Sequence, residues 1–318
     1  MMFQLHKNRS FSTYINDTFL FFKMHGKSFF KNYFIINGAL LLLLIAIVFF
    51  GFQFYFQSLF SNINAPGLIT NPVGNMINDN MASVVFLAIL VMVLFFFISV
   101  LQYAFPVIYF DLFDKKNTDD IVPSEILHSL KQKSFKIFKF FIALIFIITP
   151  ILVIIFGINM LLFFIIIGIP LFFITAPAAL SWVNISFFHY LNSNDRLFPS
   201  LSIGFKYLKQ QFWTNVGSTI IMIIIIQIVM TIFTTIPYLL GMANMFTEFS
   251  PQSGQINPDQ FSALPILMTV VMVISLVVNY ILSNLIIVNQ GLIYYSQKET
   301  EENTSANHTI DLIGTDSE

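Results

Sequence analysis

Long apolar runs alternate along this chain with short basic stretches. An α-helix needs about 20 consecutive apolar residues to cross the hydrocarbon core of a membrane, and runs of that length recur. We therefore predict an all-α polytopic integral membrane protein with six transmembrane helices and a single membrane domain, residues 1–295. The predicted transmembrane helices lie at about 33–56, 83–110, 140–157, 160–190, 214–240 and 265–294.

The run from Phe140 to Leu191 is too long for one membrane-spanning helix. We predict two helices joined by a tight turn near Gly157 to Asn159. Proline removes a backbone donor and bends a helix, so Pro150 predicts a kink in the first of the two, and Pro170 and Pro177 predict kinks in the second.

A basic amphipathic segment precedes the fifth predicted transmembrane helix. Its apolar residues are spaced by three and four, which places them on one face of a helix, while its cations point elsewhere. That stripe consists of Phe198, Leu201, Phe205, Leu208 and Phe212. We predict an interfacial helix at 197–210, and similar ones at 11–24 and 123–137.

Three short segments mark the ends of these predicted interfacial helices: KMHGKSFF from Lys23, LKQKSF from Leu130 and LKQQFW from Leu208. Each is followed by the first helix of a transmembrane pair. The recurring order of amphipathic helix, span and span predicts three pairs built on one plan.

Composition and charge agree with a membrane protein. The chain is 57% hydrophobic and 10% charged, with a mean hydropathy of +0.80. All fifteen Lys and Arg residues fall on one side of the six predicted spans, and the loops at 57–81 and 241–262 have none. The positive-inside rule then places both termini in the cytoplasm of a bacterial-type inner membrane, with residues 296–318 as a disordered tail.

The candidate chemistry is sparse. The chain has no cysteine, and its five histidines have no ligand spacing. One carboxylate cluster, in the loop between the second and third spans, could hold a metal or act as acid and base, but we favour helix-capping acids. That cluster consists of Asp111, Asp114, Asp119, Asp120 and Glu125. We predict no catalytic, cofactor-binding or metal-binding residue.

The polar groups inside the predicted spans are amides. Asn279, Ser283 and Gln290 lie within about one helical face and suit hydrogen bonding to neighbouring helices, which is the role we favour for all of these amides, Gln102 and Asn184 included. Gln227, Asn279 and Asn284 are candidates for the polar lining of a solute path. Because no Asp, Glu, Lys or Arg lies at predicted membrane depth, coupled ion transport is disfavoured.

The segment from Ile174 to Gly217, with APAAL followed by LFPSLSIGFKYLKQQFW, resembles the membrane domain associated with glycerophosphoryl diester phosphodiesterases and related six-span families of unknown function. Phe205, Leu208, Phe212 and Trp213 match its pattern, and Gly204 stands where a serine is common. The N-terminal FSTYINDTFLFFKMHGKSFFKNY is similar to the opening of that family. The resemblance implies the architecture; because we expect no hydrolase domain here, it does not imply the phosphodiesterase activity.

These observations favour a non-catalytic protein: a scaffold or accessory subunit of a membrane complex, or a lipid-interacting module. The expected partners are anionic lipids of the cytoplasmic leaflet and a protein of the complex, with no nucleic acid. A transporter or channel for a lipid-like or neutral solute is the alternative. The predicted headgroup or partner contacts are Lys23, Lys27, Lys131, Lys133, Lys206, Lys209 and Trp213.

Overall fold

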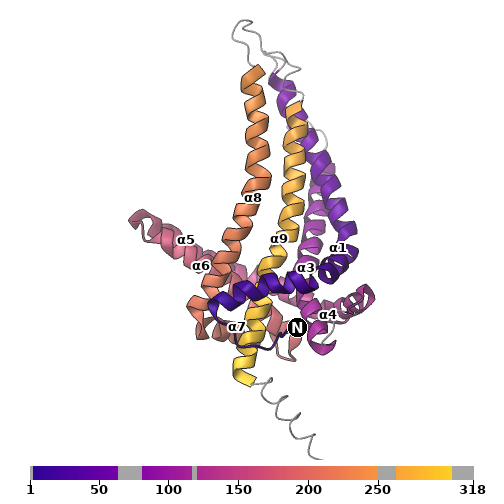
Figure 1. Cartoon of the computed structure of the whole chain (residues 1–318). Helices are drawn as coiled ribbons and strands as arrows, with labels where there is room; N and C mark the ends of the chain where they lie inside the picture. The colour runs from indigo at the N-terminus through magenta and orange to yellow at the C-terminus, as the bar shows by residue number, and fades with distance from the viewer. Residues whose placement is uncertain (1–2, 64–80, 117–119, 249–262, 303–318) are drawn as a thin grey trace, which may run out of the picture. The chain divides into compact units, whose positions relative to one another are not determined.

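A computed structural model describes residues 3–63, 81–116, 120–248 and 263–302 of the chain. Every regular element in these ranges is a helix, as Figure 1 shows. The helices are α1 (Phe11–Ile63), α3 (Met81–Lys116), α4 (Pro123–Ala143), the π-helix η1 (Leu144–Ile148), α5 (Thr149–Leu162), the 3-10 turn η2 (Phe163–Ile165), α6 (Gly168–Asn192), α7 (Leu197–Gln210), α8 (Phe212–Glu248) and α9 (Ala263–Glu302).

Six helical segments are long and apolar enough to cross a membrane, which confirms that part of the prediction. The segments are Phe11–Gln53, Ala88–Lys116, Pro123–Ile165, Gly168–Asn192, Phe212–Leu239 and Ile266–Glu302.

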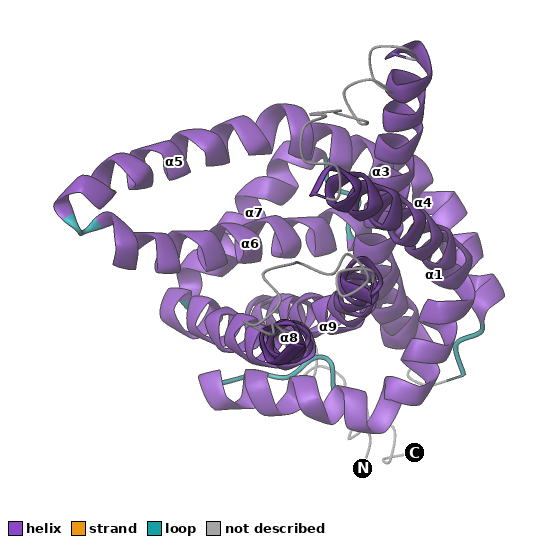
Figure 2. Ribbon diagram, turned by 90° about the horizontal axis from the view of Figure 1, so that it is seen from above, coloured by secondary structure: helices purple, strands orange, loops and turns teal. Residues whose placement is uncertain are grey.

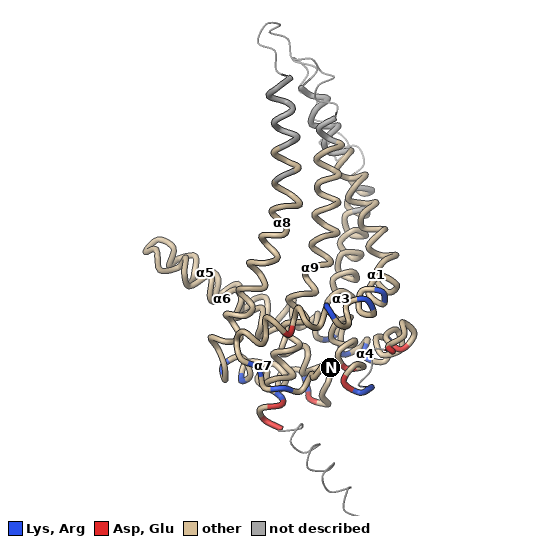
Figure 3. Tube along the Cα trace, viewed as in Figure 1, with Lys and Arg blue, Asp and Glu red and all other residues tan. Residues whose placement is uncertain are grey.

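The chain forms two compact units. Unit 1 comprises Met1–Ile36, Val100–Ile225 and Ser283–Glu318, and unit 2 comprises Asn37–Ser99 and Ile226–Leu282. All fifteen Lys and Arg residues of the sequence belong to unit 1. They lie before and in the first part of α1, at the end of α3, on α4, just before and on α7, and near the end of α9. Figure 3 shows Lys and Arg in blue. The segregation of charge seen in the sequence is therefore also a division between the two units.

Unit 2 is an apolar unit that contains the C-terminal parts of α1 and α8 and the N-terminal parts of α3 and α9. Large apolar side chains point outward from it: Leu42, Phe86 and Met92 are each at least 69% exposed. Water would penalise such a surface, whereas lipid chains accept it. Leu44, by contrast, is fully buried within the unit.

Unit 1 has an aromatic core to which four helices contribute. Phe110 of α3 stacks on Phe21 of α1 with ring centroids 5.0 Å apart, and it also contacts Tyr295 of α9 and Phe188 of α6. Phe188 in turn stacks on Tyr294 at 5.8 Å. These large buried rings supply most of the packing area between the helices.

A ladder of buried polar side chains crosses the same core. Asn289 of α9 donates to Thr18 of α1 at 3.1 Å, and the neighbouring Gln290 donates to Thr219 of α8 at 2.7 Å. The hydroxyls of Thr219 and Ser181 of α6 lie 2.9 Å apart. The prediction that Gln290 bonds between helices is thus confirmed, and Gln102 of α3 likewise bonds Ser283 of α9.

The N-terminal segment before α1 is folded into unit 1. Arg9 is 2% exposed, and its Nε donates to Asp17 at 2.8 Å while its Nη1 donates to the Leu5 carbonyl at 2.7 Å. Burial lowers the pKa of Arg9, and the hydrogen bond and charge of Asp17 oppose that shift. Phe3 packs on Phe21 and Phe113. The short polar segment before α1 is therefore held against unit 1 by the contacts of Phe3 and Arg9.

The turn predicted near Gly157 to Asn159 is wrong. Both residues lie inside α5, and the chain reverses instead at Ile166, which has a left-handed φ of 66°. Gly168 allows the close approach at this turn, because a Cβ there would lie 2.4 Å from the Asn159 carbonyl oxygen. Figure 2 shows the resulting hairpin of α5 and α6 with the turn at its tip.

Two of the three predicted interfacial helices are not separate elements. Residues 11–24 belong to the unbroken helix α1, and 123–137 continue from α4 through η1 into α5. Only 197–210 forms a helix of its own, α7, which ends where Gln211 leaves helical geometry. Asn215 of α8 caps that end by donating to the carbonyls of Tyr207 and Leu208.

The helices also extend beyond the predicted loop and tail boundaries. Helix α8 continues to Glu248, so the start of the predicted loop at 241–262 is helical. Helix α9 continues to Glu302, and Ser296 and Glu299 are buried, so the first part of the predicted disordered tail is ordered. The rest of that tail, 303–318, lies outside the described residues.

Candidate lipid-binding site

The predicted headgroup contacts fall into two groups. Lys23 and Lys27 on α1, Lys131 on α4 and Lys209 on α7 are exposed. These four lysines, which we call the collar lysines, all belong to unit 1. Their ammonium groups are accessible to anionic headgroups.

The other two predicted lysines are held by carboxylates of unit 1. Lys133 donates to Asp111 at 2.7 Å, and Lys115 shares the same oxygen at 2.9 Å. Lys206 pairs with Glu301 of α9. Lys133 therefore closes a contact between α4 and α3, and Lys206 one between α7 and α9.

Glu301 is the anchor of α7 to α9. Besides pairing with Lys206, it accepts hydrogen bonds from Tyr207 at 3.2 Å and Gln210 at 3.1 Å. Burial raises the pKa of Tyr207, and the nearby charge of Glu301 raises it further. The neutral hydroxyl thus remains a donor, which keeps α7 fixed.

The buried face of α7 differs from the predicted stripe. Leu201 and Leu208 are buried as predicted, but Phe198 is 65% exposed and Phe205 is 56% exposed. The buried face also includes Gly204, which sequence reasoning treated as a departure from a pattern. A purely apolar count could not separate the two faces, because large apolar side chains such as Phe198 and Phe205 also lie on the exposed face.

Gly204 allows α7 and α6 to cross closely. A Cβ at this position would lie 2.0 Å from Ser186 Oγ and 2.8 Å from the Ser186 backbone nitrogen. Trp182 of α6 adds a hydrogen bond at 2.9 Å to the Leu201 carbonyl of α7. The serine common in the resembling family would not fit between these backbones.

The outward face of α7 therefore combines aromatic rings with a cation. Trp213, just after the helix, is 71% exposed, and it follows Phe198, Phe205 and Lys209 on exposed positions. Aromatic rings beside lysine are typical of the membrane interface, where the ring enters the acyl region and the ammonium stays among headgroups.

A cavity of about 320 Å³ lies between the two arms of the α5–α6 hairpin, entirely within unit 1. Phe140, Leu152 and Phe156 line one side of it. Ala176 and Ala179 line the other side, where their small side chains leave space. The sequence predicted neither the cavity nor a site at this position.

The cause of the cavity is the local widening of the first arm. Pro150 offers no N–H and clashes with the carbonyl one turn earlier, so an α-helix cannot continue regularly through it. The backbone N–H of Thr149 instead reaches the carbonyl of Leu144, five residues back, and forms the π-turn η1. Such turns bend a helix and occur often at functional sites.

Two of the polar side chains on the cavity wall already donate to carbonyls close to them in the chain. Thr149 Oγ1 donates to the Leu144 carbonyl at 2.7 Å, and Asn184 donates to the Leu180 carbonyl at 2.8 Å. Tyr103 of α3 also lines the cavity. The wall is therefore suited to an apolar occupant more than to a polar solute.

The residues predicted to line a polar path are divided between the two units. Gln227 and Asn279 are exposed positions of unit 2, whereas Asn284 is buried in unit 1. The backbone carbonyl of Gln227 accepts a hydrogen bond from Thr231 on the same helix. The polar path through these three residues stays a prediction.

Three carboxylates of the predicted cluster form ion pairs or hydrogen bonds with other side chains of unit 1. Asp111 holds Lys133 and Lys115, Asp114 bonds His6 at 2.9 Å, and Glu125 pairs with Lys116. Asp119 lies outside the described residues. Among those residues, no group of three or more His, Asp or Glu side chains could hold a metal ion.

Sequence reasoning missed Arg9, the cavity and the close crossing at Gly204. The sequence did contain a signal for the turn, because Gly168 and Pro170 follow shortly after Ile166, where the chain reverses. The sequence did not indicate that Arg9 is buried, since its partner Asp17 lies in a segment predicted as an interfacial helix.

The described helices define the class of the chain as an all-helical, multi-pass membrane protein. No family model, curated protein or solved structure matches the chain. The resemblance to the phosphodiesterase-associated membrane domain therefore stays a prediction.

Proposed function

We propose that the chain is a non-catalytic membrane protein that binds anionic lipids through the collar lysines and the outward face of α7. The observation that carries the proposal is that one face of α7 is packed within unit 1 and the other is exposed. Gly204 and Tyr207 fix one face, while Phe205 and Lys209 are exposed on the other. A surface with rings and an ammonium group suits the headgroup region of a membrane.

The proposed orientation places the collar lysines at the cytoplasmic leaflet of an inner membrane, with both termini in the cytoplasm. Cysteines introduced at Asn75 and Ser253, in the two loops without Lys or Arg, test this orientation. We expect an impermeant thiol reagent to label both from the outer side of intact cells. Labelling only after permeabilisation would reverse the orientation.

The lipid proposal is tested by the composition of the lipids that co-purify with the protein. Replacing Lys23, Lys27, Lys131 and Lys209 together by Glu should abolish the enrichment of phosphatidylglycerol over phosphatidylcholine, because each lysine contributes about 1 kcal/mol near an anionic surface. The matched control replaces the same four residues by Arg, which keeps the charge. Unchanged enrichment in the Glu variant would refute the proposal.

A role as scaffold or accessory subunit uses the same surface, with an acidic partner in place of lipid. A protein that co-purifies with the Arg variant but not with the Glu variant would support it. The cavity favours a second candidate function, the transport of a lipid-like solute, over transport of a polar one. A labelled lipid that crosses proteoliposomes only when the protein is present would support that candidate.

A further inference from the structure

We propose that the hairpin cavity binds one acyl chain of an anionic phospholipid, with the lipid phosphate held at Lys139 of α4. This proposal rests on the proposed function, because it names a single site within the lipid-binding surface. It differs from the collar in kind: the collar would contact many exchanging headgroups, whereas the cavity would retain one lipid.

The cavity has room for one acyl chain at most. Its volume of about 320 Å³ is at the lower end for small-molecule sites. Its lining on α6 runs from Ala176 to Phe187, which corresponds to about 16 Å of helix. A whole lipid would not fit in this space, but one acyl chain would.

The cavity is also open at its side. Thr149 and Tyr103 both line it, and both are exposed, Tyr103 by 37%. A chain could therefore enter laterally from the hydrocarbon without any helix unfolding.

An apolar chain is the occupant that physics favours. Water would find few partners there, because Thr149 and Asn184 already donate to carbonyls of their own helices. An empty cavity would forfeit the dispersion contacts of its lining. Transfer from bilayer to cavity brings no hydrophobic gain, since both are apolar, so preference for one lipid must come from its headgroup.

Cations stand at one end of the cavity. The Phe140 and Phe187 rings, which both line the cavity, lie 4.7 Å apart at that end, and Tyr190 lies 5.9 Å from Phe140. Lys136 is held there over the Tyr190 ring and donates to the Ser193 carbonyl at 2.8 Å.

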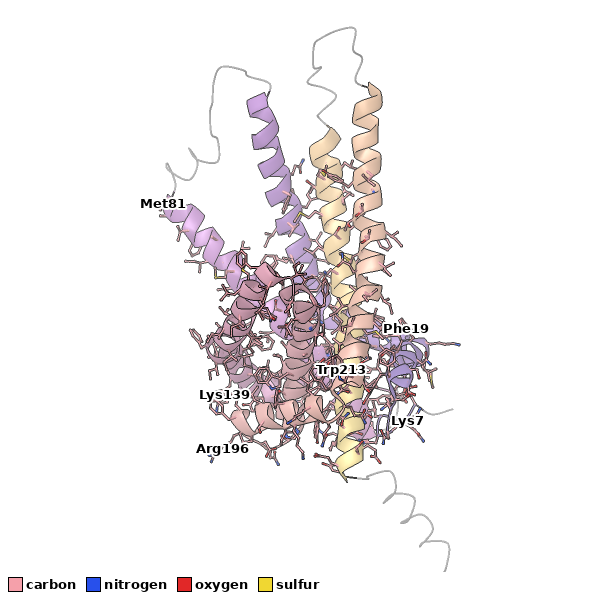
Figure 4. All side chains as sticks on the ribbon, turned by 90° about the vertical axis from the view of Figure 1, so that its left-hand side faces the viewer. Lys7, Phe19, Met81, Lys139, Arg196 and Trp213 are labelled. Atoms are coloured by element: carbon pink, nitrogen blue, oxygen red, sulfur yellow. The ribbon has the colours of Figure 1, made fainter. Side chains whose placement is uncertain are left out.

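Lys139 lies on the same helix, next to Phe140, and is exposed. Figure 4 labels Lys139 and Arg196 beside the hairpin. A phosphate at Lys139 would place its acyl chain at the cavity entrance.

The test is native mass spectrometry of the purified full chain titrated with phosphatidylglycerol, and in parallel with phosphatidylcholine and a free fatty acid of the same chain length. We expect one phosphatidylglycerol to remain bound at activation energies that remove the others. Equal retention of phosphatidylcholine, or retention of the fatty acid alone, would overturn the proposal.

Two variants locate the site. Ala179→Phe should fill the cavity and abolish the single retained lipid, whereas Ala88→Phe, at an exposed alanine of α3, should leave it. Lys139→Gln should weaken retention about fivefold, the equivalent of one lysine at an anionic surface. Retention unchanged by both Ala179→Phe and Lys139→Gln would overturn the proposal.

Two further measurements keep the result interpretable. Thermal unfolding shows whether Ala179→Phe folds, and if it does not, Leu152→Ala replaces it: enlarging the cavity should shift the preference toward longer or branched chains. Phosphatidylglycerol enrichment that survives in Ala179→Phe but is lost in the collar Glu variant would refute the cavity and keep the collar. Enrichment that is lost in Ala179→Phe but survives in the collar Glu variant would refute the proposed function.

Discussion

The two halves of α6 show how one helix can pack tightly on one neighbour and leave a cavity beside another. Its C-terminal half crosses α7 so closely that Gly204 meets the Ser186 backbone. Its N-terminal half packs on α5 near the turn, where Asn159 donates to Thr175 at 3.0 Å, but it leaves the cavity beside Ala176 and Ala179. Small residues occur in both halves. Their effect depends on the partner: a straight helix closes onto them, and a helix widened by a π-turn does not.

The largest expected effect is on the packed half. Gly204→Ala forces a Cβ against the backbone of Ser186, which cannot rotate away as a flexible side chain could. We expect a loss of about 3 kcal/mol in the free energy of unfolding, at the upper end for overpacking. Thermal unfolding in detergent measures it, and Ser202→Ala, at an exposed position of α7, is the control. Equal stability of the two variants would mean that α6 and α7 are not in close contact.

A second effect concerns the hydrogen bonds that hold the packed half to its neighbours. Thr219→Val keeps the shape of the side chain but removes the oxygen shared by Ser181 and Gln290. Leaving buried polar groups without a partner costs about 1–3 kcal/mol, so we expect a loss of about 2 kcal/mol. Thr231→Val, an exposed threonine of α8, is the matched control. A destabilisation equal to that of the control would remove the ladder as a stabilising element.

A substitution in the N-terminal half of α6 should have a local effect. In Gly168→Ala the Cβ would lie 2.5 Å from the Phe163 backbone nitrogen, so the turn must open. Because the tip of the hairpin has little core behind it, we expect a fall of about 1 kcal/mol or less in global stability.

Faster hydrogen exchange in η2 and at the start of α6 would show that local response to Gly168→Ala. Gly157→Ala, where a Cβ would meet nothing within 4 Å, is the control and should be neutral or slightly stabilising. Global unfolding by Gly168→Ala would mean that the tip belongs to the core.

These contrasts also show why sequence reasoning succeeded in part. Six helices were predictable because the length of an apolar run is a local property. The hairpin turn was not, because Gly157 looked like a turn residue and is an ordinary helix residue, whereas the true turn uses Ile166 at a φ that isoleucine rarely adopts. The packing of Gly168 against Asn159 and Phe163 decides which of the two positions forms the turn.

The candidate site divides in the same way. Exposed lysines such as Lys209 could be predicted from helical periodicity. The pairing of Lys133 with Asp111 and of Lys206 with Glu301 could not, since it depends on contacts between distant segments. The cavity depends on a change of helical turn before Pro150, and the proline alone indicates a kink without its direction.

The last prediction concerns the tip of the hairpin and changes no stability. Phe164 is 88% exposed and Ile166 is 75% exposed, and the turn has no polar side chain to face water. Its backbone is satisfied internally: Ile166 donates to the Phe163 carbonyl at 3.0 Å and Ile167 to the Ile165 carbonyl at 2.7 Å. Irregular backbone at membrane depth requires such internal bonds, whereas a turn in water does not.

We therefore expect the tip to end within the hydrocarbon, so that α5 and α6 enter and leave on the side of the collar lysines. A cysteine at Ile166 should then resist an impermeant reagent from the outer side, under conditions that label Asn75→Cys and Ser253→Cys. A permeant reagent should reach all three, which shows that the thiol at position 166 is reactive. Labelling of Ile166→Cys from the outer side would mean that the hairpin crosses the membrane completely, as two full transmembrane helices.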